Sequence, residues 1–383
     1  MSSIKKILLL SNFRPDNQLS MLRFGKLLAS EQPQSLHFEI QEIFPPPVFT
    51  KICPIGKLRK WAAYIDKYLL FPKGLNRELI SLKDSVSLIH IIDHSNAIYL
   101  PKLSRITRAK KVITCHDLIA IRSAKGDFDQ APQTSKSGKH LQNWISGSLH
   151  HADYYACDSK QTLEDLHRFI PMSSKKSTVI HLGTEVNSSL KSPNITDLTN
   201  ELPFDPTTTN FLLHVGSAAW YKNRKAVFRS FMYAHRCLPK HDLKLVLVGP
   251  APQKEELDVN LTSFLRLNQD SIYSMKDLSE KNLHFLYRKA KIMVFPSFIE
   301  GFGWPPLEAA SHGCPIISTR TGAIHDLLGE YCHYADPNSQ KIINQAVIKL
   351  LKSNIRRKLN LELPTLNDCK RNYFEMYKRL IKN

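Results

Sequence analysis

The chain has 383 residues, a length that predicts two or three domains and a core that needs neither disulfides nor a structural metal. Hydrophobic residues make up 42% and charged residues 23% of it, which excludes wholesale disorder. The seven cysteines are scattered and form no Cys-x-x-Cys pair, which fits a reducing cytoplasm and argues against a disulfide framework or a zinc module. We expect neither a signal peptide nor a membrane span, because no apolar run approaches roughly 18 residues.

The charge balance is strongly positive, with 53 Lys and Arg against 34 Asp and Glu and a net charge of +19. Such a surface attracts nucleic acid, anionic lipid or anionic small molecules, although a basic surface that only confers solubility has the same composition. No recognisable nucleic-acid module accompanies the charge, so nucleic acid is the least favoured of these partners.

Short apolar, β-branched runs alternate along the chain with longer segments of helical spacing. The predicted strands are 4–10, 86–92, 111–115, 152–157 and 178–182, then 211–215, 243–248, 292–295 and 315–318. Runs that are apolar on both faces suit parallel sheets covered by helices, and the alternation implies a doubly wound α/β architecture with right-handed crossovers. Proline and small polar residues over 187–210 predict a linker, and two sheets so joined predict a cleft at the carboxyl ends of their strands.

The segment 51–73 interleaves lysine and arginine with large apolar residues. From about Lys57 it predicts a basic amphipathic helix, with Trp61 as an aromatic anchor, that suits an anionic membrane surface. A helix whose apolar face lies in the domain core explains the pattern equally well.

Residues 295–308 carry the most specific pattern in the chain. A predicted strand ends, a loop with two glycines and two prolines follows, and a helix begins near Pro305. Gly301 and Gly303 allow close approach of the backbone to a ligand, and the free amides of the helix start favour a phosphate. Glu300 and Glu308 are placed to accept hydrogen bonds from hydroxyls at two points of one ligand, although a plain strand–turn–helix has the same spacing.

The sequence Glu300-Gly-Phe-Gly-Trp-Pro-Pro-Leu-Glu308, followed by Gly313-Cys-Pro-Ile-Ile-Ser318, resembles the Glu-x7-Glu signature of retaining GT-B glycosyltransferases of family 4, also called group 1. Further segments resemble elements of the same family in the same order: 212–223, 245–250, 278–290 and 322–326, with 114–118 and 179–184 in the first half. The resemblance implies two Rossmann-like domains that face each other across a cleft.

The implied organisation is an acceptor-side domain over 1–190, a linker over 191–209, a nucleotide-sugar-binding domain over 210–366 and a C-terminal helix over 367–383. The last helix has one apolar face, and we expect it to pack back on the N-terminal domain.

The resemblance implies a nucleotide-sugar donor held mainly by the C-terminal domain. By position, Glu300 would bind hydroxyls of the transferred sugar and Glu308 the hydroxyls of the ribose. Gly301 belongs to the same loop, and backbone amides around Phe302 and Gly303 would face the sugar or the diphosphate.

Lys222, beyond the Gly216 turn, stands where the family places its phosphate-binding lysine. The family usually has an arginine four or five residues earlier, where this chain has serine and alanine. Arg224 and Arg320 are the candidates to replace it, and a solvated basic turn is the alternative reading of Lys222 and Arg224.

In the N-terminal half, His116 follows a predicted strand and matches the family's histidine that faces the donor sugar, where an imidazole could hydrogen-bond a hydroxyl. Asp93, His94 and Asn12 are weaker acceptor-side candidates. Asn12 lies where many relatives have a Gly-Gly pair, so acceptor recognition does not carry over from the family.

The sequence therefore predicts a retaining glycosyltransferase that uses a UDP- or GDP-sugar and a glycan or glycolipid hydroxyl, without metal or other cofactor. The triplet 127–129, Asp-Phe-Asp, is interpreted as a solvated loop rather than a metal site. We expect a cytoplasmic protein that can associate with the inner membrane face. The alternatives are a sugar-nucleotide epimerase and a degenerate GT-B protein that holds nucleic acid or membrane without transfer.

Overall fold

The computed structural model describes residues 5–30, 38–53, 56–81, 86–184, 202–276, 278–353, 356 and 359–382. The chain divides into two compact units. Unit 1 consists of residues 1–127, 133–182 and 366–383, and unit 2 of residues 128–132 and 183–365. The linker expected over 191–209 lies outside the described residues up to residue 201.

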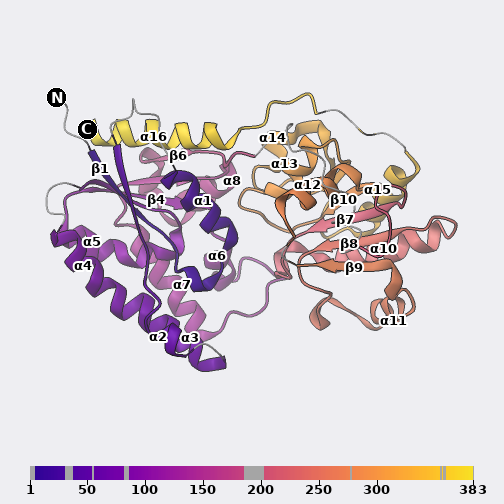
Figure 1. Ribbon diagram of the computed structural model, residues 1–383, viewed down its shortest axis with the longest axis horizontal. Helices are drawn as coiled ribbons and strands as arrows, with labels where there is room; N and C mark the ends of the chain where they lie inside the picture. Colours follow the sequence, from indigo (N-terminus) through magenta and orange to yellow (C-terminus); the bar gives the residue numbers. More distant parts are fainter. Residues whose placement is uncertain are drawn as a thin grey trace. The chain divides into compact units, whose positions relative to one another are not determined.

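Unit 1 is built on a six-stranded parallel sheet of order β2-β1-β3-β4-β5-β6 (Figure 1). Its strands are β1 (Lys5–Leu10), β2 (Phe38–Ile43), β3 (Val86–Ile91), β4 (Lys110–Cys115), β5 (Tyr154–Cys157) and β6 (Ser177–Val179). Its helices are α1 (Leu19–Ala29), α2 (Phe49–Ile52), α3 (Gly56–Ile65), α4 (Phe71–Ser81), α5 (Leu100–Ile106), α6 (Ile119–Lys125), α7 (Lys136–Leu149), α8 (Lys160–Phe169) and α16 (Leu366–Lys382). A π-helical turn over Asp66–Leu70 joins α3 to α4.

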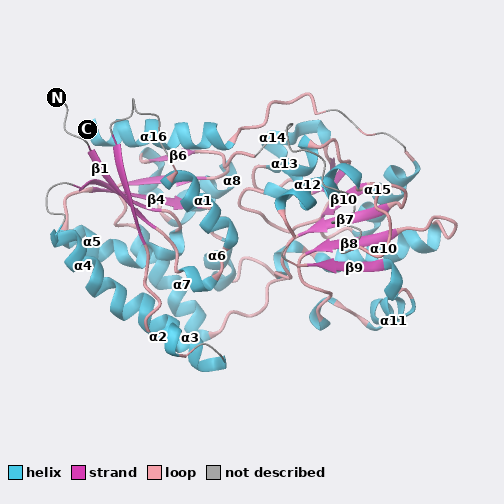
Figure 2. Cartoon of the chain, in the orientation of Figure 1, coloured by secondary structure: helices cyan, strands magenta, loops and turns pink. Residues whose placement is uncertain are grey.

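Unit 2 repeats this plan with the sheet order β12-β11-β10-β7-β8-β9, again with parallel pairing (Figure 2). Its strands are β7 (Phe211–Val215), β8 (Lys244–Val248), β9 (Ile272–Met275), β10 (Ile292–Phe295), β11 (Ile316–Ser318) and β12 (His333–Tyr334). Its helices are α10 (Arg224–Cys237), α11 (Val259–Leu267), α12 (Glu280–Lys289), α13 (Trp304–Ser311), α14 (Ile324–Leu328) and α15 (Gln340–Lys352). The doubly wound α/β prediction is confirmed for both halves.

The central strands match the predicted runs because they are buried on both faces: β7 and β10 are buried along their whole length. The strands that sequence reasoning missed, β2, β9 and β12, are edge strands. In β2 only Ile43 is buried, so its residues do not form an apolar run.

The C-terminal helix α16 belongs to unit 1 although it follows unit 2 in the chain (Figure 1). Tyr373 and Tyr377 are fully buried, and the hydroxyl of each contacts a polar side chain of the sheet. The Tyr377 hydroxyl lies 2.5 Å from His90 Nδ1, and the Tyr373 hydroxyl lies 3.0 Å from Thr114 Oγ1. Burial lowers the pKa of His90 to about 3, so its imidazole is neutral in the core.

In the described part of the chain, no helix combines the length and the apolar character that crossing a bilayer requires.

Candidate functional site

The loop between β10 and α13 needs glycine for geometric reasons. Gly303 precedes the first residue of α13 and has φ of 95°, a left-handed conformation that strains other residues. A Cβ at this position would lie 2.5 Å from Ile324 Cγ1. Gly303 thus lets the loop turn sharply against Ile324 of α14.

At this loop the structure joins two predicted donor-binding residues, Lys222 and Glu300. Lys222 Nζ donates to Glu300 Oε1 at 2.8 Å and to Oε2 at 2.9 Å. The lysine side chain is 14% exposed and the glutamate side chain 7%, so the pair is largely withdrawn from water. The Glu300 amide donates to Thr321 Oγ1 at 2.9 Å, and the ammonium group lies 5.0 Å from the Phe295 ring centre. This burial argues against the alternative reading of Lys222 as part of a solvated turn, and its contact with phosphate stays a prediction.

The Gly216 turn, at the end of β7, lies against the stem of Lys222. A Cβ on Gly216 would be 3.6 Å from Lys222 Cδ and 3.4 Å from His214 Nε2. His214 Nδ1 lies 2.9 Å from the Val294 carbonyl oxygen, which only accepts, so this nitrogen carries the proton and Nε2 does not. Burial, with Arg224 and Lys222 nearby, lowers the pKa of His214 to about 3. Sequence reasoning missed this residue, although a histidine inside an apolar strand was a visible signal.

Arg224 does not lie open beside Lys222 as a phosphate ligand would. It is the first residue of α10 and 2% exposed. Its Nη2 donates to the Pro250 carbonyl oxygen at 2.7 Å, and its Nε lies 3.4 Å from Glu256. Burial lowers the pKa of this guanidinium and Glu256 opposes the change. In this structure Arg224 connects α10 to the segment after β8, which argues against a solvated turn, and its contact with the phosphates stays a prediction.

Arg320, the other candidate, follows β11 and is exposed. Its guanidinium lies 4.6 Å from the Tyr334 ring centre and contacts His325 Nε2. The expected replacement of the missing arginine therefore stays a prediction.

Glu308, on α13, is buried, and one of its carboxylate oxygens accepts a hydrogen bond of 3.1 Å from the Tyr287 hydroxyl. Tyr287 belongs to α12, so two helices set the position of this carboxylate. Next to it, His284 Nδ1 lies 2.6 Å from His312 Nε2, and burial lowers the pKa of His312 to about 4.

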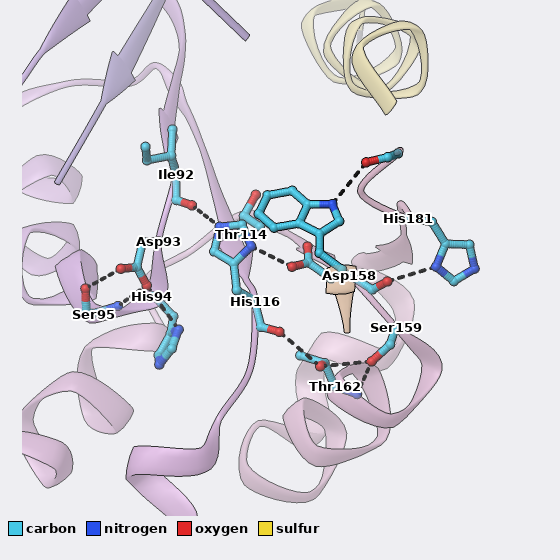
Figure 3. A network of polar contacts seen from close by, with 12 residues as sticks. Ile92, Asp93, His94, Ser95, Thr114, His116, Asp158, Ser159, Thr162 and His181 are labelled. Atoms are coloured by element: carbon cyan, nitrogen blue, oxygen red, sulfur yellow. Dashed lines mark hydrogen bonds and ion pairs between the residues drawn. The ribbon is translucent and has the colours of Figure 1, made fainter. Parts of the chain in front are cut away.

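In unit 1, His116 follows β4 and is buried (Figure 3). Its Nδ1 lies 2.6 Å from Asp158 Oδ2, and its Nε2 lies 2.8 Å from the Ile92 carbonyl oxygen. Burial lowers the pKa of His116, but Asp158 overcomes this effect and raises it to about 9. Both ring nitrogens therefore donate within unit 1. Neither is free in this structure for the expected hydrogen bond to a sugar hydroxyl.

The three weaker candidates form one cluster at the carboxyl ends of β1 and β3. Asn12 Nδ2 donates to Asp93 Oδ2 at 2.5 Å and also contacts Gln18, and Asn12 Oδ1 accepts from Asn96 at 2.9 Å. His94 Nδ1 lies 3.2 Å from Asp93 Oδ1. The amide groups of Asn12 are thus occupied by protein partners, and its role is to hold Asp93.

The Asp-Phe-Asp triplet lies partly in an ion-pair network, which corrects its interpretation as a solvated loop. Asp127 contacts Arg168 at 2.6 Å and Arg122 at 3.2 Å, and Arg122 also contacts Asp165 at 2.9 Å. These arginines lower the pKa of Asp127 against the effect of its burial.

In the described part of the segment 51–73, α2 ends at Ile52 and α3 continues through the π-helical turn into α4. Its large apolar side chains differ in exposure, and several of them, such as Ile65 and Leu70, are partly buried. Phe71 is buried in the core of unit 1, whereas four others are mostly exposed: Ile52 (73%), Leu58 (69%), Trp61 (67%) and Leu69 (60%).

The chain has the GT-B architecture, which consists of two parallel α/β units. The fold is similar to that of sucrose-phosphate synthase from Thermosynechococcus elongatus, with a TM-score of 0.66, 17% identity and coverage of 98% of this chain and 96% of that one. It is also similar to a structure titled trehalose-6-phosphate from E. coli bound with UDP-2-fluoro glucose, with a TM-score of 0.62, 11% identity and coverage of 99% and 96%.

Residues 200–363 match the family model of the glycosyl transferases group 1. This match agrees with the family resemblance found in the sequence. Over 80 residues the chain is 34% identical to O-antigen chain mannosyltransferase B of Escherichia coli, which covers 21% of each protein. Over 254 residues it is 24% identical to the serotype-specific mannosyltransferase WbdA of Escherichia coli, which covers 63% of this chain and 30% of the relative. The matches thus span less than a third of these two relatives.

Proposed function

We propose that the protein transfers a sugar from a nucleotide-sugar donor to an acceptor hydroxyl with retention at the anomeric carbon, without metal or other cofactor. The observation that carries this proposal is the buried Lys222–Glu300 pair between the Gly216 turn and the Gly303 loop. The names of the relatives make mannose the first sugar to test and an O-antigen-like polysaccharide the first acceptor class.

The pair provides both kinds of group that a nucleotide sugar requires. An ammonium group stabilises the charge that develops on a leaving diphosphate, and a carboxylate accepts hydrogen bonds from sugar hydroxyls. Binding of the diphosphate to Lys222 would release Glu300 from its ion pair and make its oxygens available for hydroxyls. Glu308, positioned by Tyr287, would accept from the ribose. A same-face reaction, in which the leaving phosphate helps to deprotonate the acceptor, requires no further protein nucleophile.

The test is thermal unfolding of the protein with UDP, GDP, ADP and dTDP in turn. A nucleotide at about 100 times its dissociation constant stabilises the folded state by roughly 2.7 kcal/mol. We expect one nucleotide to raise the melting temperature and the Lys222→Ala variant to lose that shift. Lys341→Ala, at an exposed position of α15 in the same unit, is the matched control and should retain it.

If none of the four nucleotides stabilises the protein, the donor site is wrong. The same holds if both lysine variants respond like the unmodified protein. If one nucleotide does bind, the corresponding mannose nucleotide is tested for release of free mannose and for transfer. The configuration of the product then decides retention, and unchanged rates in EDTA are expected for a metal-independent enzyme.

A second part of the proposal concerns location. We propose that the enzyme is cytoplasmic and contacts an anionic membrane surface through the four exposed apolar residues of 51–73 and the exposed Lys60 between them. Support comes from their exposure and from the basic composition of the segment. Vesicles with and without anionic lipid provide the test. Sedimentation with anionic vesicles should require Trp61 and Leu58, and equal binding by the Leu58→Ser, Trp61→Ser double variant would refute this contact.

A further inference from the structure

The segment 128–132 belongs to unit 2 by its contacts, although the chain on both sides of it belongs to unit 1. It lies in the connection between α6 and α7. Asp127, the residue before it, is held in unit 1 by ion pairs to Arg122 and Arg168. After it, α7 is capped by Ser135, whose hydroxyl oxygen accepts a hydrogen bond of 3.1 Å from a backbone amide of the helix. The segment is therefore attached to unit 1 at both ends and makes its own contacts in unit 2.

The first of these contacts is aromatic. Phe128 packs on Trp220, with the ring centres 5.1 Å apart. Trp220 also stacks on Phe298, with ring centres 6.3 Å apart and an angle of 26° between the planes. All three rings are partly buried. Because aromatic rings pack in preferred orientations, Phe128 and Phe298 together restrict the position of the Trp220 ring.

Trp220 is the first residue of a 3-10 turn that ends at Lys222, and we call residues 220–222 the Lys222 turn. The carbonyl oxygen of Tyr221, its middle residue, accepts from the Phe298 amide at 2.8 Å. A shift of the Trp220 ring therefore moves the backbone that carries the lysine. Such a shift matters because the ammonium group has to stay within hydrogen-bond reach of Glu300 or of a phosphate oxygen.

The second contact of the segment supports the other end of the Lys222 turn. Gln130 Nε2 donates to Asn338 Oδ1 at 3.0 Å. Asn338 follows Pro337, whose carbonyl oxygen accepts from Asn223 Nδ2 at 3.0 Å. Asn223 comes directly after the Lys222 turn and ends it with φ of 49°, a left-handed conformation that asparagine tolerates. The segment 128–132 is thus connected to the Lys222 turn at both of its ends.

We propose that the segment 128–132 positions Lys222 for the diphosphate of the donor. Phe128 and Gln130 are positioning residues that hold the Lys222 turn without touching the ligand. The turn depends on such support because Lys222 is the only cationic residue in the sequence 216–223, where the family usually has an arginine as well. This inference rests on the proposed function, since that function gives Lys222 its phosphate.

The test measures the reactivity of the Lys222 amine towards acetic anhydride in the protein without ligand. Mass spectrometry of the digested protein gives its acetylation rate relative to that of the exposed Lys341 in α15. Glu300 protects the amine by pairing with it, so displacement of the turn raises this ratio. We expect a rise of about fivefold in Phe128→Ala and none in Phe128→Tyr, which keeps the aromatic ring. Gln130→Ala, which removes one hydrogen bond, should raise the ratio about twofold.

Two control variants separate positioning from general loosening of the fold. Gln133→Ala truncates a glutamine at an exposed position of the same connection, but in the part that belongs to unit 1. Phe264→Leu weakens the packing of α11 in unit 2, where the Phe264 ring contacts Phe231. Both controls should keep the acetylation ratio of the unmodified protein.

An unchanged ratio in Phe128→Ala would overturn the inference, and so would an equal rise in Phe264→Leu. For the nucleotide that stabilises the protein, the dissociation constant should rise about fivefold in Phe128→Ala and stay the same in Phe128→Tyr. An unchanged constant in Phe128→Ala would likewise refute the positioning role.

The acetylation experiment uses no nucleotide, so its outcome is separate from that of the proposed function. A protein that binds no nucleotide but shows the rise in Phe128→Ala would refute the donor site and confirm that the segment 128–132 holds the Lys222 turn. A protein that binds a nucleotide and shows no rise would keep the donor site and lose this inference.

Discussion

The Lys222–Glu300 pair makes a quantitative prediction about the stability of unit 2. Removing one partner of a largely buried ion pair leaves the other charge without compensation, which typically costs about 3–5 kcal/mol. Glu300→Gln keeps one hydrogen-bond acceptor for the ammonium group, so we expect a loss of about 2 kcal/mol in the free energy of unfolding. Lys222→Met removes the ammonium group and leaves a carboxylate that is 7% exposed, so we expect about 3 kcal/mol.

The double variant decides whether these losses come from the pair. With both charges removed, neither remains uncompensated, and we expect the double variant to be more stable than the sum of the single losses by about 1–3 kcal/mol. Urea unfolding followed by tryptophan fluorescence provides the measurement. Trp220 and Trp304 lie in unit 2 and Trp61 and Trp144 in unit 1, so a background with the latter two changed to Phe reports on unit 2 alone.

Additive losses, within about 0.5 kcal/mol, would refute the reasoning, because independent sites add. Comparison of the single and double variants also separates the effect of Lys222 on stability from its contact with the ligand. The double variant still lacks the Lys222 ammonium group. Stabilisation by the nucleotide should therefore stay lost even where the free energy of unfolding recovers. If nucleotide binding recovers together with stability, Lys222 does not contact the diphosphate.

Two further predictions concern backbone geometry and pH. Gly303→Ala should destabilise unit 2 by about 2 kcal/mol, because its Cβ would clash with Ile324 at a backbone angle that disfavours alanine. Gly74→Ala, in the open interior of α4 in unit 1, should be neutral or stabilising when urea unfolding is followed in the protein with all four tryptophans. The pKa of His116 is raised from 6.5 to about 9 in the folded state, so its contribution to stability is fully present below pH 6.5 and is lost as the pH rises to about 9. Asp158→Asn should flatten that decline between pH 6.5 and 9 in thermal unfolding, and an equally steep decline in the variant would assign it to another group.

The loop of residues 300–308 shows what local sequence can predict. Two glycines, two prolines and two glutamates over nine positions predict a sharp strand–turn–helix connection, and the structure has one with Gly303 at φ of 95°. The order of apolar runs likewise predicts two parallel α/β halves, since central strands are buried on both faces. The edge strand β2 was not predicted, because only one of its six residues is buried and the strand therefore has no apolar run.

The partners of the site residues were beyond the reach of the sequence. Lys222 and Glu300 are 78 positions apart, and both were assigned to the donor without any sign that they pair with each other. Arg224 had the local appearance of an exposed phosphate ligand, but the packing of α10 against the segment after β8 buries it. Such contacts depend on which strands become neighbours, and spacing along the chain carries no information about that.

His94 and His116 of unit 1 show the same difference between what the sequence determines and what the tertiary structure decides. Residue type and position alone determined that His94 and His116 stand at strand ends, where parallel sheets place their ligand-binding groups. Only the tertiary structure decided which of them keeps a free ring nitrogen, because the occupant of the second nitrogen of His116 is a backbone carbonyl 24 positions away and its other partner, Asp158, comes from the next strand. Sequence determines which side chains a strand end presents, and the pairing of the strands determines which of their hydrogen-bonding groups remain available.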